Sequence, residues 1–154
     1  EMLSECERLN LDDEHWEEIL PLPTVAWGCN LVTLETTQSL YCFGGHPDSS
    51  LDGFIYTIQR LCLEDLVWEI LSVALPAADH SIPCFKVDEE EVYLISMKTL
   101  HVFNPLNNSF ERLGKMIELW GVSNQCYYRG ETLHLTSEEN ILLSLKIGPL
   151  FNEK

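Results

Sequence analysis

The sequence predicts an all-β protein whose neighbouring strands run antiparallel. Short apolar or alternating segments dominate the chain, and each is bounded by Gly, Pro, Asn, Asp or a pair of acidic residues. Helix signals are weak, and the spaces between the segments leave no room for the crossover helices that parallel strands need. A strand, turn and strand pattern also recurs along the chain, which indicates a repeat architecture.

Each expected strand is a short run of apolar or alternating residues between two turn signals, and together they form an antiparallel meander. In chain order the expected strands cover 8–11, 16–20, 26–34, 40–43, 54–63, 67–73, 83–87, 92–96, 100–103, 109–113, 125–128, 132–135 and 141–147.

Three copies of the repeat align without a gap, at 8–19, 60–71 and 102–113. In each copy an apolar residue precedes an aromatic residue, a polar turn lies between them, and a glutamate follows the aromatic residue. The apolar residues are Leu9, Leu61 and Phe103, the aromatic residues are Trp16, Trp68 and Phe110, and the glutamates are Glu17, Glu69 and Glu111. A strand, a tight turn and a second strand explain the pattern, so we expect the three aromatic residues in the core.

A second shared element precedes two of these copies. Leu40–Phe43 lies before Trp68, Val92–Ile95 lies before Phe110, and Thr132–Leu135 begins a further copy. With one more strand per unit, each unit holds four strands in about 40 to 50 residues, which is the size of a β-propeller blade.

The segment Leu40–Gly45, followed by Leu61, an acidic turn and Trp68, resembles a kelch repeat. That family closes an apolar strand with a double glycine, here Gly44 and Gly45, because residues without a Cβ allow a sharp turn and a close approach of neighbouring blades. The later units depart from the motif, with Ser96-Met97 and Thr136-Ser137 at the glycine positions. We expect one domain over 1–154, a kelch-like propeller segment with units at roughly 8–24, 25–75, 82–117 and 124–154.

The number of units predicts that this chain alone does not close a ring. Propellers contain about four to eight blades, whereas the chain supplies about three blades' worth of strands. The remaining blades would come from a longer chain, from a partner or from a second copy.

The resemblance to kelch proteins implies a non-catalytic protein-interaction or scaffold module within a larger kelch-like protein or assembly. Modules of this family recruit substrates to ubiquitin ligases, bind cytoskeletal elements or organise complexes. Two alternatives remain at this stage. Some kelch-like propellers are copper radical oxidases or sugar-acid isomerases, and an unclosed propeller could be a structural subunit that pairs through its open edges.

The acidic composition limits the partners. A formal net charge of −16 and a pI near 4.4 repel nucleic acid and anionic lipid, and no segment reaches the roughly 20 apolar residues of a membrane span. The acidic run Asp88, Glu89, Glu90 and Glu91 is either a solvated turn or a docking surface for a basic protein.

Two other loops contain candidate partner-binding residues. His46 and Asp48 follow the double glycine, and Trp120 lies in a Glu-Leu-Trp-Gly segment as either a loop anchor or a blade-edge residue. Asn107-Asn108-Ser109 has the form of a glycosylation sequon but occupies the turn of the repeat, so we interpret it as turn chemistry.

Catalytic signals are sparse, so we expect neither an enzyme nor a cofactor. The five histidines lie in separate segments without metal-ligand spacing, and no phosphate-binding or dinucleotide motif occurs. Cys126, Tyr127 and Tyr128 bring together residue types that copper radical oxidases use, but neighbours in a strand point to opposite faces. Most of the six cysteines lie in strand-like segments, which favours reduced thiols in a cytoplasmic protein, although their even number also allows disulfides.

Overall fold

The computed structural model describes residues 4–48, 53–78, 82–115, 122–129, 131–137 and 142–146. This part of the chain forms thirteen strands and no helix, and every pairing between neighbouring strands is antiparallel. The predicted all-β meander is therefore confirmed. Nothing among the described residues forms a helix long and apolar enough to cross a membrane.

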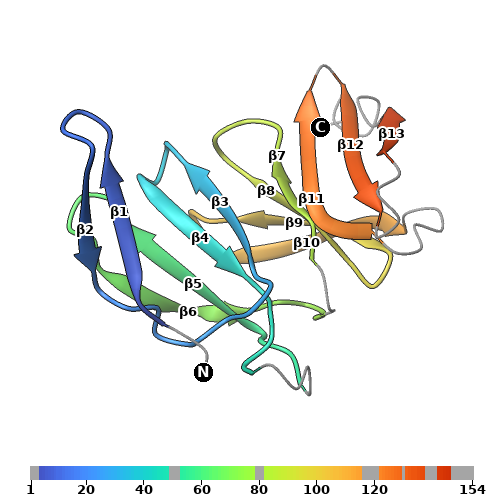
Figure 1. Ribbon diagram of the computed structural model, residues 1–154. Coiled ribbons are helices and arrows are strands. Elements are labelled where there is room, and N and C mark those ends of the chain that lie inside the picture. The colour runs from blue at the N-terminus through green and yellow to red at the C-terminus, as the bar shows by residue number, and fades with distance from the viewer. Residues whose placement is uncertain are drawn as a thin grey trace.

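The strands form four sheets in chain order (Figure 1). The first sheet is the hairpin β1 (Cys6–Asn10) and β2 (His15–Ile19). The second contains β3 (Asn30–Leu34), β4 (Ser39–Phe43), β5 (Thr57–Cys62) and β6 (Trp68–Ala74). The third contains β7 (Cys84–Lys86), β8 (Val92–Ser96), β9 (Thr99–Asn104) and β10 (Ser109–Lys115). The fourth contains β11 (Val122–Arg129), β12 (Thr132–Ser137) and β13 (Leu142–Lys146).

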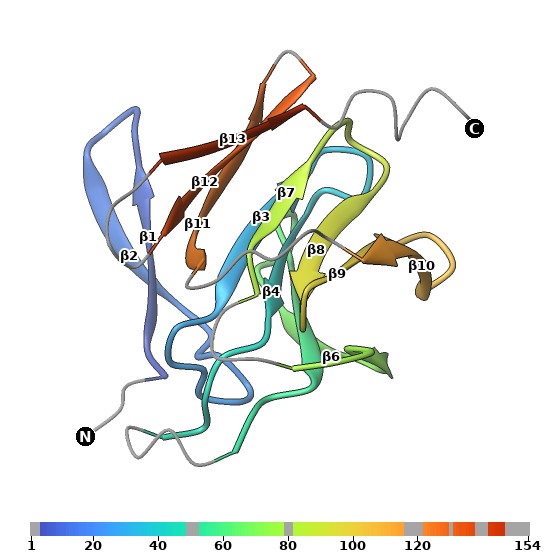
Figure 2. The same cartoon turned by 90° about the vertical axis from the view of Figure 1, so that its right-hand side faces the viewer.

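The sheets are arranged as an open, propeller-like series. The leading strands of the last three sheets are neighbours, because β7 contacts both β3 and β11. Figure 2 shows β3 and β7 side by side, with the later strands of their sheets extending away from them. In Figure 1 the first and last sheets lie at opposite ends of the series. This confirms an unclosed series of antiparallel sheets, two of which are four-stranded.

The backbone repeats where the sequence does. Leu9 pairs with Trp16, Leu61 with Trp68, and Phe103 with Phe110 as direct cross-strand partners. The residue two positions before the repeat aromatic has a positive φ in all three turns: 55° at Glu14, 58° at Leu66 and 51° at Asn108. The three hairpins therefore share one backbone geometry, although their turn sequences differ.

Short polar side chains stabilise these turns by accepting hydrogen bonds from the backbone. The Asn10 Oδ1 accepts from the N–H of Asp12 at 3.0 Å, and the Asn104 Oδ1 accepts from the N–H of Leu106 at the same distance. The Ser109 hydroxyl donates to Asn107 Oδ1 at 2.6 Å. The interpretation of the sequon-like segment as turn chemistry is confirmed.

The main core fills the space between the second and third sheets. Phe103 is fully buried there, and its ring meets those of Tyr41 and Phe43 edge-on at centroid distances of 5.8 and 5.7 Å. Phe110 packs against the same cluster and contacts Phe103 at 5.1 Å. Phe110 therefore lies between two sheets, as the repeat predicts.

A second core lies between the third and fourth sheets. Phe85 and Tyr93 stack at 5.4 Å on one side, and the fully buried Leu133 and Leu135 of β12 face them. Every residue of β8 is buried, because this strand's alternate side chains enter the two cores on opposite faces of the third sheet.

The prediction that all three repeat aromatics are core residues is wrong for Trp16, whose side chain is 57 % exposed. At each repeat the aromatic residue lies on the face directed toward the preceding sheet. Phe110 meets the second sheet, and Trp68 is half-buried on the face of the second sheet opposite the main core. No described residue forms a sheet that would cover Trp16.

Candidate protein-interaction surfaces

The double glycine forms a corner that holds neighbouring segments together. Gly44 and Gly45 have φ values of 68° and 98°, which residues with side chains rarely adopt. A Cβ on Gly45 would lie 2.8 Å from the carbonyl oxygen of Trp27, and one on Gly44 would lie 2.8 Å from Ile82 Cδ1, at the entrance to the third sheet. Close approach of the backbone requires glycine at position 45, whereas at position 44 the positive φ is the stronger reason, because the end of the Ile82 side chain can shift.

His46 is part of this corner and is fully buried. Its backbone pairs with that of Trp27 in an isolated bridge, its Nδ1 lies 2.9 Å from the carbonyl oxygen of Gly53, and its ring contacts that of Phe54 at 5.1 Å. The imidazole therefore has a structural role and offers no surface to a partner. Asp48, two residues later, is exposed.

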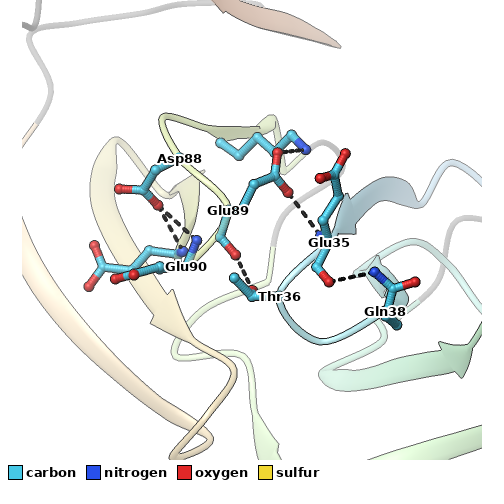
Figure 3. Close-up of polar contacts among 8 residues, drawn as sticks. Glu35, Thr36, Gln38, Asp88, Glu89 and Glu90 are labelled. Carbon is cyan, nitrogen blue, oxygen red and sulfur yellow. Dashed lines mark hydrogen bonds and ion pairs between the residues drawn. The ribbon is translucent and has the colours of Figure 1, made fainter.

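The acidic run 88–91 connects two sheets (Figure 3). Glu89 Oε2 accepts a hydrogen bond from the N–H of Glu35 at 2.9 Å, and the Thr36 hydroxyl donates to the carbonyl oxygen of Glu89. The other carboxylate oxygen of Glu89 pairs with Lys86. Through Glu89 the β7–β8 loop is thus tied to the β3–β4 turn of the preceding sheet.

The remaining acids of this run also have internal contacts. Asp88 Oδ1 accepts from the N–H groups of Glu90 and Glu91 at 2.9 and 3.3 Å, and the Tyr93 hydroxyl donates to Glu91 Oε2 at 2.9 Å. The Glu35 N–H and then the Lys86 ammonium lower the pKa of Glu89. Burial and Glu91 raise the pKa of Tyr93. Of the four acids, only Glu90 has a side chain without a hydrogen bond or ion pair among the described residues.

The outer face of the first sheet combines exposed apolar residues with a pair of glutamates that lies between Trp16 and Leu20. Trp16 is 57 % and Leu20 54 % exposed, and Leu9 lies beside Trp16 as its cross-strand partner. Glu7 and Glu18 are exposed and lie directly opposite each other on the same face. We call these five residues the acidic end face.

The outer face of the fourth sheet has a different chemistry. Tyr127 is 53 % exposed and its ring stacks on that of His134 at 4.6 Å, and the His134 Nδ1 lies 3.0 Å from the Ser144 hydroxyl. Arg129 and Lys146 flank this stack on the same face, on either side of Thr132. We call this surface the basic end face; its residues are Tyr127, Arg129, Thr132, His134, Ser144 and Lys146.

A concavity of about 300 Å³ opens along the three leading strands. Leu31, Phe85 and Tyr128 line it, with Lys86 as its cation. Cys126 also reaches it, but its thiol donates to the carbonyl oxygen of Cys84 at 3.0 Å, and burial raises its pKa to about 12. Among the described residues no three His, Cys, Asp or Glu side chains are grouped as metal ligands would be.

All six cysteines are free thiols. Cys42 is buried and hydrogen-bonds Cys29, which lowers the pKa of Cys29 to about 7 and raises that of Cys42.

The structure thus separates the predicted partner-binding residues. It buries His46, ties Asp88, Glu89 and Glu91 into internal contacts, and leaves Asp48 and Glu90 exposed. The candidate Trp120 lies outside the described residues. The basic end face was missed by sequence reasoning, because its residues come from three strands whose pairing only the structure shows.

Comparisons with known proteins support the fold only. No protein-family model and no curated protein matches the chain. Among solved structures it is similar to the structure of YjhT, with a TM-score of 0.68 and 13 % sequence identity, over 86 % of this chain and 50 % of that chain. The chain therefore spans about half the length of the YjhT chain, and the similarity shows a shared fold.

Proposed function

We propose that this chain is a kelch-like propeller segment that acts as a non-catalytic protein-interaction module through the outer faces of its end sheets. The observation that carries the proposal is the exposure of Trp16. Its repeat equivalent Phe110 packs between two sheets, whereas Trp16 and Leu20 are both more than half exposed to water. Large aromatic residues of this kind are the usual anchors of protein interfaces.

The chemistry of the surface favours a protein partner. The Leu9 and Trp16 pair adjoins the Glu7 and Glu18 pair on this face, so apolar and charged groups lie side by side, as they do in protein interfaces. The net charge of −16 disfavours an anionic polymer on any face. A partner with an apolar patch and basic residues fits this surface best.

Photocrosslinking from position 16 tests the proposal. A photoreactive phenylalanine analogue is placed at position 16 and, as the matched control, at Leu106, which is 74 % exposed in the β9–β10 turn. Cell extract or purified protein is irradiated and the adducts are identified by mass spectrometry. We expect defined protein adducts from position 16 only, and excess unlabelled protein should suppress them while its Trp16→Ser variant should not. The same adducts from both positions, or none, would contradict the proposal.

A further inference from the structure

We propose that the acidic end face docks on the basic end face of a second copy of this chain, head to tail. The inference rests on the proposed function, because it names the partner of the same surface. Both halves of the contact are present in one chain. Each face carries an exposed aromatic residue, and the charges of the two faces are opposite.

The acidic end face carries an uncompensated repulsion. Glu7 and Glu18 are direct cross-strand partners, and like charges in that arrangement destabilise a hairpin. The nearest cation of the first sheet, Arg8, lies on the opposite face and pairs with Glu17. Within the described part of the chain neither Glu7 nor Glu18 has an ion-pair partner. A cation on a docked surface would remove this repulsion.

The basic end face supplies such cations. The strands β11, β12 and β13 contain no Asp or Glu, although acidic residues outnumber basic ones by 25 to 9 in the whole chain. Arg129 and Lys146 are exposed on the outer face, and neither forms an ion pair among the described residues. Charge segregation of this kind between two faces of one chain gives a directional contact.

The internal interfaces of the chain show how the two faces would meet. Between the second and third sheets, Tyr41 of β4 packs on Phe103 of β9 at 5.8 Å. Like Tyr41, His134 lies on the face of its sheet that is turned away from the preceding sheet, and Leu9 is the repeat equivalent of Phe103. Docking the fourth sheet of one copy on the first sheet of another in the same manner brings the Tyr127 and His134 stack over Leu9 and Trp16. The contact thus continues the interface that already joins neighbouring sheets.

A head-to-tail contact either closes into a ring or extends into a fibre. The described residues of each copy form two four-stranded sheets and two smaller ones, so two copies fall within the range of about four to eight blades in closed propellers. We therefore infer a closed dimer with two identical contacts.

Charge reversal with rescue tests the dimer. Mass is measured by light scattering for the wild type, for Glu7→Lys/Glu18→Lys, for Arg129→Glu/Lys146→Glu, for an equimolar mixture of the two variants and for the chain with all four changes. Glu64→Lys/Glu90→Lys is the matched control, because it makes the same charge change at exposed positions away from both end faces. Circular dichroism establishes that each variant is folded.

We expect the wild type and the control at twice 17.7 kDa, each reversed variant as a monomer, and the dimer restored in the mixture and in the fourfold variant. A monomeric wild type, or a dimer that the reversals leave unchanged, overturns the second copy as the partner. Failure of the mixture to reassociate overturns it as well. A monomeric wild type that still gives position-16 adducts with another protein leaves the proposed function standing without the dimer.

Discussion

Phe110 and Trp16 occupy the same position of the repeat in the third and the first sheet, and their environments differ. Each follows a positive-φ turn residue and pairs with an apolar residue of the neighbouring strand. Phe110 packs into the main core, whereas Trp16 is 57 % exposed. The repeat therefore determines which face a side chain points to, and a neighbouring sheet determines whether that face is buried.

The largest expected difference between the two sheets concerns the strand partners of these aromatics. Phe103→Ala should destabilise the protein by about 3 to 5 kcal/mol, because it empties a fully buried position between two sheets. Leu9→Ala, at the equivalent position of the first sheet, should cost under about 1 kcal/mol because its neighbourhood is already exposed. Urea denaturation measures both, and similar losses would contradict the comparison.

The double-glycine corner should show the next largest effect. Gly45→Ala should destabilise by about 2 to 4 kcal/mol, because a Cβ there meets the Trp27 carbonyl oxygen at 2.8 Å and φ is 98°. Gly53→Ala is the matched control: its φ is 88° but a Cβ would meet nothing within 4 Å, so about 1 kcal/mol is expected. Equal losses in thermal denaturation would mean that the backbone conformation, and not the close approach, requires glycine.

The unit without a double glycine should gain stability from a better turn. Met97 and Lys98 form the two-residue β8–β9 turn with φ values of 48° and 60°, a geometry that Asn-Gly adopts at least cost. Met97→Asn/Lys98→Gly should therefore stabilise the protein by about 1 kcal/mol. Asn108→Gly creates the same Asn-Gly pair in the β9–β10 turn. It should have a smaller effect, because only the second residue of that pair has a positive φ. Denaturant midpoints distinguish the two.

The smallest expected effect is the pH dependence of the junction between the second and third sheets. The pKa of Glu89 is lowered in the folded state, by the Glu35 N–H first and by Lys86 second. Its contribution to stability is present above the ordinary value of 4.5 and is lost as the pH falls through the folded-state pKa. As the pH is lowered from 5, the melting temperature of Glu89→Gln should fall less than that of the wild type. Glu90→Gln is the control, because the Glu90 side chain has no hydrogen bond or ion pair among the described residues.

Much of the fold follows from local sequence patterns. Alternating apolar residues and turn-forming residues locate the strands, and the recurring turn places Glu14, Leu66 and Asn108 in one conformation. These features depend on residues close together in the chain, so a single sequence contains the information. The position of Phe110 between sheets also follows, because a strand sends alternate side chains to opposite faces.

The candidate surfaces depended on packing between distant segments. The sequence alone could not show that His46 is enclosed by Trp27, Gly53 and Phe54, or that Glu89 bonds to the backbone of Glu35 in another sheet. The repeat pattern predicted a buried Trp16, because the equivalent position in the third sheet lies between two sheets. Burial of Trp16 would need a neighbouring sheet, which no described residue provides.

Sequence by itself determined the strand order, the turns and the face on which each side chain lies, since these follow from local backbone chemistry and the alternation of a strand. Tertiary structure decided which of those faces are covered and which charges meet, because burial and ion pairing arise only when sheets from separate parts of the chain are brought together. The acidic and basic end faces are the product of both: their residues alternate along strands, and their exposure comes from their places in the first and last sheets.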